Sequence, residues 1–188
     1  MAPILGIYAS QISGHLFAPS GAYDSIATTT VGAGGVSSVT FSSIPQTYTH
    51  LQVRYIARGT DTSNNIYFTL NSDTSGNYSD HLLYGDGSSV ATANGVNTST
   101  PQYISIANSS RLASTFAAGV FDLLDYANTN KFKTTRTLSG REDNSAGIVL
   151  FASANWRNTN AVTSLTFTPT NGSFAQYSSF ALYGIKGN

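Results

Sequence analysis

The sequence contains 188 residues, nine of them Lys or Arg and nine Asp or Glu, so its formal net charge is zero. A neutral chain offers no electrostatic attraction to nucleic acid or to an anionic membrane, and the composition argues against both partners. There is no Cys, which excludes disulfide bonds and thiolate metal sites. Charged residues make up only 10% and hydrophobic residues 40%, so Ser, Thr, Asn and Gly must solvate the surface, as they do in β-rich domains.

Residues 1–22 differ from the rest of the chain, because isolated apolar residues stand there among Ser and Gly. The apolar residues of this segment are Ile4, Leu5, Ile7, Ile12, Leu16 and Phe17. The segment is too apolar for a free tail and too irregular for a helix or strand, and termini are ordered only when something holds them. We therefore predict an extended arm over 1–22, which buries these side chains either on a neighbouring subunit or on its own core. Its apolar run is short and has no leading positive charge, so we expect no secretory signal.

From Tyr23 onward, short strand-like runs alternate with turn clusters. The clearest run is 51–57, where apolar and polar residues alternate as expected for a strand with one buried face. Runs at 26–31 and 36–44 flank a Gly-rich turn at 32–35 and predict a β-hairpin. The remaining predicted strands cover 66–70, 81–84, 102–107, 131–138, 147–156, 162–168 and 180–185.

Two segments fit this pattern less well. Residues 86–101 are polar and contain Gly, which predicts a long exposed loop or a hairpin tip. Residues 111–127 carry apolar side chains at helical spacing, but the same run fits a strand buried on both faces. Gly119 and Thr115 disfavour a helix, so we prefer the strand. Many short strands with regular turn signals predict an all-β fold, an antiparallel β-sandwich or barrel, over residues 23–188.

The sequence shows no pattern that carries catalysis. His15, His50 and His81 lie far apart in the chain, without the spacing of a metal site or a catalytic pair. There is no nucleophile elbow, phosphate-binding loop or dinucleotide fingerprint. We therefore expect neither enzyme activity nor a cofactor.

Residues 71–76 resemble the first half of a calcium-binding EF-hand loop. The twelfth position of such a loop would be Leu82, so the bidentate Glu that binds calcium most strongly is missing. A turn in which Asn and Asp side chains satisfy the backbone is the better interpretation.

Two carboxylates, Asp122 and Asp125, lie within the apolar run discussed above. A buried carboxylate needs a cationic or hydrogen-bonding partner. Arg136 and Lys133 are the predicted partners, and a structural ion pair is favoured over a metal site.

Aromatic residues beside Asn-rich loops are candidates for stacking on a glycan or for contacts at a subunit interface. These candidates are Tyr67, Tyr78, Tyr84, Tyr103, Trp156 and Tyr177. Tyr and Trp also fill sandwich cores, so a core role is the alternative for each of them.

Five segments of the chain carry a resemblance to a known family. They are residues 3–14 (PILGIYASQISG), 23–28 (YDSIAT) with 31–35 (VGAGG), 41–54 (FSSIPQTYTHLQVR), 125–131 (DYANTNK) and 181–187 (ALYGIKG). Together they resemble a family of virion structural proteins of similar length encoded by tailed phages, over essentially the whole chain. The family supplies no catalytic or binding residues to carry over.

The resemblance implies a jelly-roll-like sandwich displayed on the capsid or the tail of a virion that is assembled in the host cytoplasm. The first expectation is a capsid decoration (cement) protein, which binds capsomers through the arm and the sandwich edges. Its partners would be other virion proteins and further copies of itself, with a trimer as the expected homo-oligomer. The alternative is a tail-fibre or receptor-binding module that recognises glycans on the host surface.

Overall fold

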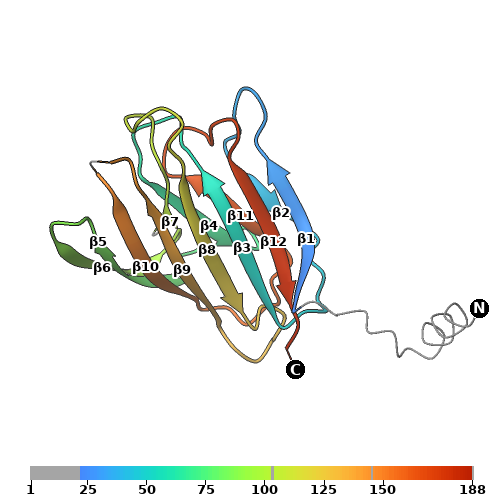
Figure 1. Cartoon of the computed structure of the whole chain (residues 1–188). Helices are drawn as coiled ribbons and strands as arrows, with labels where there is room; N and C mark the ends of the chain where they lie inside the picture. The colour runs from blue at the N-terminus through green and yellow to red at the C-terminus, as the bar shows by residue number, and fades with distance from the viewer. Residues whose placement is uncertain (1–21, 103, 145, 188) are drawn as a thin grey trace, which may run out of the picture.

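The computed structural model describes residues 22–102, 104–144 and 146–187. The six apolar residues of the predicted arm, His15 and Tyr103 therefore lie outside the described residues. The described chain forms twelve strands in two antiparallel sheets and contains no helix. The prediction of an all-β antiparallel sandwich is confirmed (Figure 1).

The larger sheet has eight strands and the smaller has four. In spatial order, the larger sheet consists of β1 (Tyr23–Thr30), β12 (Ser179–Ile185), β3 (His50–Ala57), β8 (Ala117–Leu124), β9 (Lys133–Arg141), β10 (Ile148–Trp156), β5 (Tyr78–Gly85) and β6 (Val90–Thr98). The smaller sheet consists of β2 (Val39–Phe41), β11 (Leu165–Pro169), β4 (Asn65–Leu70) and β7 (Ile104–Ser105).

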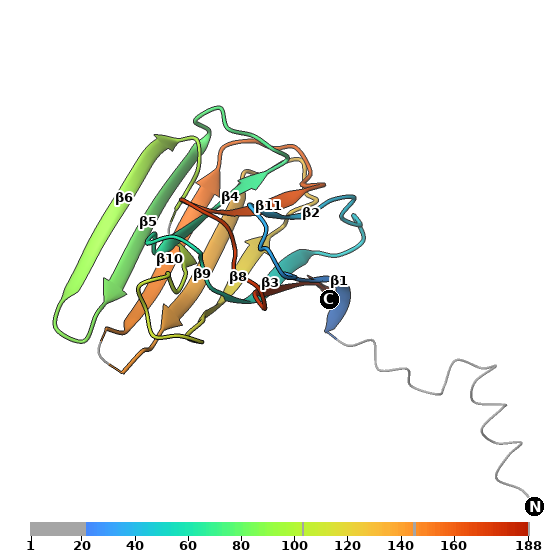
Figure 2. The ribbon, with the colours of Figure 1, turned by 90° about the horizontal axis from the view of Figure 1, so that it is seen from above.

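The connectivity is that of a jelly roll with two inserted hairpins. The order β1-β12-β3-β8 faces the order β2-β11-β4-β7, which are the two four-stranded sheets of a jelly roll. The hairpins β5–β6 and β9–β10 are inserted between these strands and add β9, β10, β5 and β6 to one edge of the larger sheet. We call these four strands the extension. Figure 2 shows β5 and β6 lying to one side, away from β2 and β11.

Aromatic side chains fill the space between the two sheets. Phe121 of β8 packs edge-to-face on Phe68 and Phe167 of the smaller sheet, with ring centroids 4.8 and 5.3 Å apart. Phe180 stacks on Phe167 at 5.7 Å. These rings are buried, so the main core lies under the jelly-roll part of the larger sheet.

The predicted hairpin over 26–31 and 36–44 is wrong. Strand β1 pairs with β12 in the larger sheet, whereas β2 pairs with β11 in the smaller one. The Gly-rich segment 32–35 therefore crosses between the layers, and Val36 forms an isolated bridge with Phe174. A Gly-rich turn between two apolar runs does not reveal whether the runs pair with each other.

Of the two alternatives for 86–101, the long loop is wrong, since most of the segment forms β6, whereas residues 86–89 are the tip of the β5–β6 hairpin. The preferred strand within 111–127 is confirmed as β8. A tight turn joins β5 to β6, in which the Asp86 carboxylate accepts hydrogen bonds from the backbone N–H groups of Ser88 and Ser89. No residue of β6 is fully buried, so this strand lacks the apolar–polar alternation that marks most strands.

Candidate interaction surface

The outer face of the larger sheet carries apolar side chains in two adjacent rows. The pairing of β3, β8, β9, β10, β5 and β6 aligns one row across these six strands. This row consists of Ile56, Ala118, Gly140, Val149, Gly85 and Val90. The next row on the same face consists of Arg54, Val120, Leu138, Phe151, Leu83 and Thr92, so it is apolar over its four middle strands.

Six large apolar side chains of these rows are about half exposed or more. They are Ile56, Leu83, Val90, Leu138, Val149 and Phe151, and we call them the apolar stripe. Their exposure ranges from 47% for Ile56 to 74% for Val90. Single exposed apolar residues are common on soluble proteins, but a contiguous band of this kind marks an interaction surface or a liability to aggregate.

The stripe is long and narrow. Neighbouring strands lie about 4.8 Å apart, so the five spacings from β3 to β6 give a length of about 24 Å. The two rows are two residues apart along the strands, a separation of about 7 Å. All but one of the six residues come from the extension, so the stripe is mainly a property of the two inserted hairpins.

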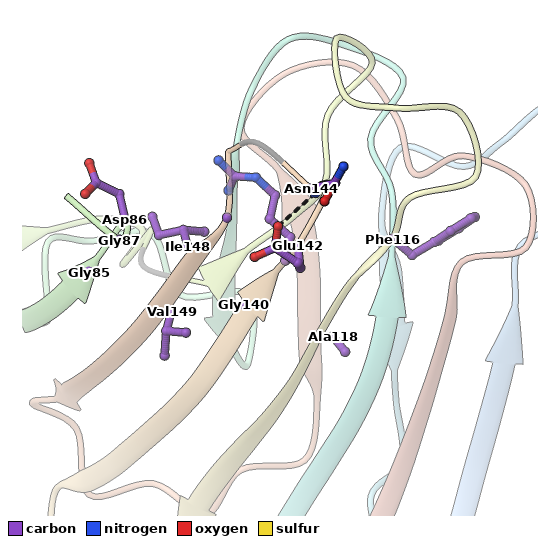
Figure 3. A pocket seen from close by; sticks show the side chains of 12 residues that line it. Gly85, Asp86, Gly87, Phe116, Ala118, Gly140, Glu142, Asn144, Ile148 and Val149 are labelled. Atoms are coloured by element: carbon purple, nitrogen blue, oxygen red, sulfur yellow. Dashed lines mark hydrogen bonds between the residues drawn. The ribbon is translucent and has the colours of Figure 1, made fainter. Parts of the chain in front are cut away.

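A hollow of about 800 Å³ lies along one side of the stripe, between β8, the β9–β10 turn and the β5–β6 turn (Figure 3). Ala118, Gly140 and Gly85 line it, and the lack of large side chains at these positions is what hollows the surface. A Cβ atom at Gly140 would lie 2.7 Å from the backbone oxygen of Ile148, so no larger residue fits there. The side chain of Val149 borders both the hollow and the stripe.

The polar groups at the rim of the hollow are engaged in holding the turn. The Glu142 carboxylate accepts hydrogen bonds from the backbone N–H groups of Asp143, at 3.0 Å, and Asn144, at 2.8 Å. Asp143 also lies 3.5 Å from the Arg111 guanidinium. Burial, together with the neighbouring Arg111, lowers the pKa of Arg141. The arrangement shapes a surface, and the described residues that line the hollow include no nucleophile paired with a base.

The opposite end of the same face is polar. The side chain of Gln52 donates to Asp122 at 2.8 Å and accepts from Arg54 at 3.0 Å. The Arg54 guanidinium also lies over the rings of Tyr23 and Tyr183, 5.5 Å from each centroid. The charged groups of Arg54 and Asp122 thus interact with other side chains of the same face. This polar region lies between the stripe and the start of β1.

Neither predicted partner, Arg136 or Lys133, forms a direct ion pair with these two carboxylates, although the charge of Lys133 helps to lower the pKa of Asp125. Asp122 hydrogen-bonds to Gln52, and Asp125 pairs with Lys131 at 2.7 Å, a contact that lowers the pKa of Asp125. Lys133 is fully buried and donates to three backbone carbonyl groups, those of Asn128, Lys131 and Thr159. Its ammonium group thus links the loop before β9 to the loop after β10. The spacing of residues in the sequence does not reveal this role.

Two of the six aromatic candidates are core residues, and a glycan cannot stack on them. Tyr78 and Trp156 are almost completely buried and stack on each other at 6.4 Å. Tyr67 and Tyr84 are half-buried on β4 and β5, and Tyr177 is 69% exposed in the loop before β12. No ring contact joins these three within the described residues, so they form no common platform.

The turn at 71–76 is structural, as the sequence predicts. The Asp73 carboxylate accepts hydrogen bonds from the backbone of Ser75 at 2.9 Å, from Asn77 at 2.8 Å and from the indole of Trp156 at 2.7 Å. Desolvation raises the pKa of Asp73, but these hydrogen bonds outweigh it and bring the pKa to about 2.

The part of the chain that the structure describes holds no cluster of three or more His, Asp or Glu side chains able to bind a metal ion. The imidazole of His50 accepts a hydrogen bond from the backbone of Asp125 at 2.9 Å, and His81 is exposed. The described residues also contain no helix of the length and hydrophobicity needed to cross a membrane. No family model, curated protein or solved structure matches the chain significantly.

Proposed function

We propose that this chain is a non-catalytic structural protein of a tailed-phage virion, and that it decorates the capsid by binding capsomers. The sequence segments that resemble such proteins give the biological setting. The observation that carries the proposal is the apolar stripe, because a band of half-exposed apolar side chains gains free energy only when another surface covers it.

The size of the stripe suits a contact repeated many times on a particle. Full burial of a Leu or Phe side chain contributes about 1.5–3 kcal/mol, so covering six half-exposed residues supplies roughly 5–9 kcal/mol. Association of two free proteins costs about 4–15 kcal/mol in lost freedom of motion. One stripe alone therefore binds weakly, and simultaneous contacts in an assembly are needed for tight attachment.

The free edge of the larger sheet offers a second contact. Strand β6 pairs with β5 on one side, and within the described chain no strand pairs with its other side. Its sequence, VATANGVNT, contains no charge and no Pro, the residues with which proteins normally protect an edge strand. Such an edge favours pairing with a neighbouring sandwich.

A homo-oligomer, with a trimer as the proposed state, fits these surfaces. A net charge of zero produces little repulsion between copies packed closely together. The proposed partners are other virion proteins, and the proposed location is the virion after assembly in the host cytoplasm.

Quantitative mass spectrometry of purified virions tests the proposal. A decoration protein should be present in numbers comparable to the major capsid protein, whereas a tail component should be present in a few copies.

Particles carrying the double variant Leu138→Lys, Phe151→Lys should contain fewer copies, because two adjacent stripe residues become charged. The variant Thr134→Lys, at an exposed position on the same face, serves as the control. Absence of the wild-type chain from virions would refute the proposal.

A receptor-binding module is the second candidate, and a polar hollow of about 500 Å³ favours it. Asn94, Asn97, Thr98 and Gln102 line this hollow beside β6, and the buried Asp80 carboxylate lies at its base. Amides and hydroxyls of this kind hydrogen-bond to sugars. Asn97 has a φ of 55°, and Arg157 fixes its side-chain oxygen by a hydrogen bond of 2.7 Å.

Titration calorimetry with purified host polysaccharide tests this second candidate. Binding that Asn97→Ala abolishes, and that Asn171→Ala on a distant loop leaves unchanged, would support it. Absence of heat for the wild-type chain at saturating polysaccharide would reject it.

A further inference from the structure

The proportions of the apolar stripe match a single extended segment of chain. An extended segment advances about 3.3 Å per residue, so eight to nine residues, joined by seven to eight steps, span about 23–26 Å and match the stripe length of about 24 Å. The separation of the two rows, about 7 Å, leaves a track about one chain wide. The hollow beside Gly140 adds space for a large side chain along one long side of the track.

The chain itself contains a segment with the matching chemistry. Residues 1–21 include no Lys, Arg, Asp or Glu, so they can be laid on an apolar surface without burying a charge. Four of their apolar residues fall within 4–12, namely Ile4, Leu5, Ile7 and Ile12. Side chains of an extended segment alternate in direction, so Leu5 and Ile7 share one face, while Ile4 and Ile12 lie on the other. The segment can therefore turn Leu5 and Ile7 toward the stripe while its backbone stays at the surface.

We propose that residues 4–12 of a second copy of this chain lie along the apolar stripe. The direction of β1 favours a second copy over the same molecule. Strand β1 begins at Tyr23, which aligns through Ile185 with His50, the end of β3 opposite to Ile56 (Figure 1). The chain that precedes β1 therefore leaves the sheet at the end away from the stripe.

To reach the stripe of its own molecule, the arm would have to reverse and cross the polar end of the face. That end carries Arg54, Gln52 and Asp122. The ten residues 13–22, at about 3.3 Å each, span up to roughly 33 Å in the direction of β1. This reach is enough to place 4–12 on a neighbouring sandwich located past the start of β1.

The contact is head-to-tail, because the arm of one copy meets the sheet face of the next. A head-to-tail contact closes into a ring when the rotation between copies permits, and the proposed trimer is such a ring. The inference deepens the proposed function and rests on it for its biological role: on a particle, the stripe would join neighbouring copies of the chain to each other, and the free edge at β6 would remain for other contacts. The contact between copies itself requires no particle.

The mass of the purified full-length chain gives the first test, measured by sedimentation equilibrium over a range of concentrations. The wild type should self-associate, and Leu138→Lys with Phe151→Lys should weaken that association on the order of 100-fold. Leu5→Asp with Ile7→Asp should weaken it to a similar extent, while Thr134→Lys and Ser13→Asp should leave it unchanged. A wild type that stays monomeric at all concentrations would overturn the proposal. So would self-association that the stripe variants do not alter.

Single-cysteine chains give the second test, since the natural sequence has no Cys to interfere. One chain carries Ile7→Cys and the other Leu138→Cys, and the two are co-expressed and then oxidised. The proposal predicts a disulfide-linked dimer of the two chains, and a strongly reduced yield when Thr40→Cys, on the smaller sheet, replaces Leu138→Cys. A double variant that forms its bond only within one chain would place the arm on its own sandwich and overturn the proposal. Neither test requires virions, so a failure here is separate from absence of the protein from particles.

Discussion

The jelly-roll half and the extension of the larger sheet differ in the side chains that they turn inward. In the jelly-roll half, β8 points Phe121 at the smaller sheet and buries it completely. In the extension, β9 buries the polar side chains Thr135, Thr137 and Ser139 and leaves Leu138 55% exposed on the outer face. In most sandwich strands the apolar side chains face inward and the polar ones outward. Strand β9 shows the opposite arrangement.

The inversion follows from what covers each half. The inner face of β9 lies against β7, where the Ser139 hydroxyl accepts a hydrogen bond from the backbone N–H of Ser105 at 3.1 Å. Hydroxyl groups there satisfy backbone groups that apolar side chains would leave unpaired. Apolar side chains on the outer face need a different partner, which explains why the stripe lies on the extension.

Removing an aromatic ring from the jelly-roll core should produce the largest effect. Phe121→Ala leaves a cavity beside Phe68 and Phe167 and should lower the free energy of unfolding by about 3–5 kcal/mol. Urea denaturation measures this change. Leu150→Ala, in the small cluster with Leu82 under the extension, should destabilise by less, about 2 kcal/mol. Equal losses would contradict the division into a well-packed half and a sparsely packed extension.

Replacing the buried lysine should have an effect of intermediate size. Lys133→Met removes the donor to three backbone carbonyl groups, and the free energy of unfolding should fall by about 2–3 kcal/mol. Lys131→Met changes an exposed lysine two residues away and should cost less than about 1 kcal/mol. Thermal denaturation of the two variants compares them directly, and a stable Lys133→Met chain would show that the carbonyl contacts contribute little.

Acidification should produce a smaller, pH-dependent loss through Asp73. Its pKa is lowered from 3.8 to about 2 in the folded chain, so its contribution is fully present above pH 4 and disappears as the pH falls toward 2. Because the carboxylate is partly exposed, we expect roughly 1 kcal/mol after allowance for solvent screening. Urea titrations at pH 6 and pH 2.5 should show this loss in the wild type. In Asp73→Asn the corresponding part of the pH dependence should be missing.

A charge on the stripe should have the smallest effect on the stability of the isolated sandwich. Leu138→Lys replaces an exposed side chain, so the free energy of unfolding should change by no more than about 0.5 kcal/mol when self-association is suppressed by dilution. The measurement is urea denaturation at low protein concentration. A loss comparable to that of Phe121→Ala would mean that the stripe is part of the core, which would remove the contrast between the two halves.

The sequence predicts the strands whose two faces differ in polarity. The alternation over 51–57 corresponds to β3, and the run over 147–156 contains β10. Strand β6 could not be recognised because neither of its faces is fully buried. The pairing of β1 with β12 joins opposite ends of the chain, a long-range choice that local turn signals do not determine.

The candidate surface was harder to predict than the fold. A reader of the sequence would turn Leu138 inward and Thr137 outward, and only the sheet around β9 shows the opposite. In the same way, Tyr78 and Trp156 have the composition of a binding surface, but they stack on each other in the core. The outer stripe becomes visible only when pairing aligns residues from six strands.

The central claim is that another chain covers the outer face of the extension, and the rate of thiol labelling tests it most directly. Phe151→Cys and Thr40→Cys place a single thiol at an exposed position on the larger and the smaller sheet, respectively. In assembled particles, we expect the thiol at 151 to react far more slowly than the thiol at 40, and the difference to vanish after the chain is unfolded in denaturant. Equal labelling rates at both positions in intact particles would contradict the claim.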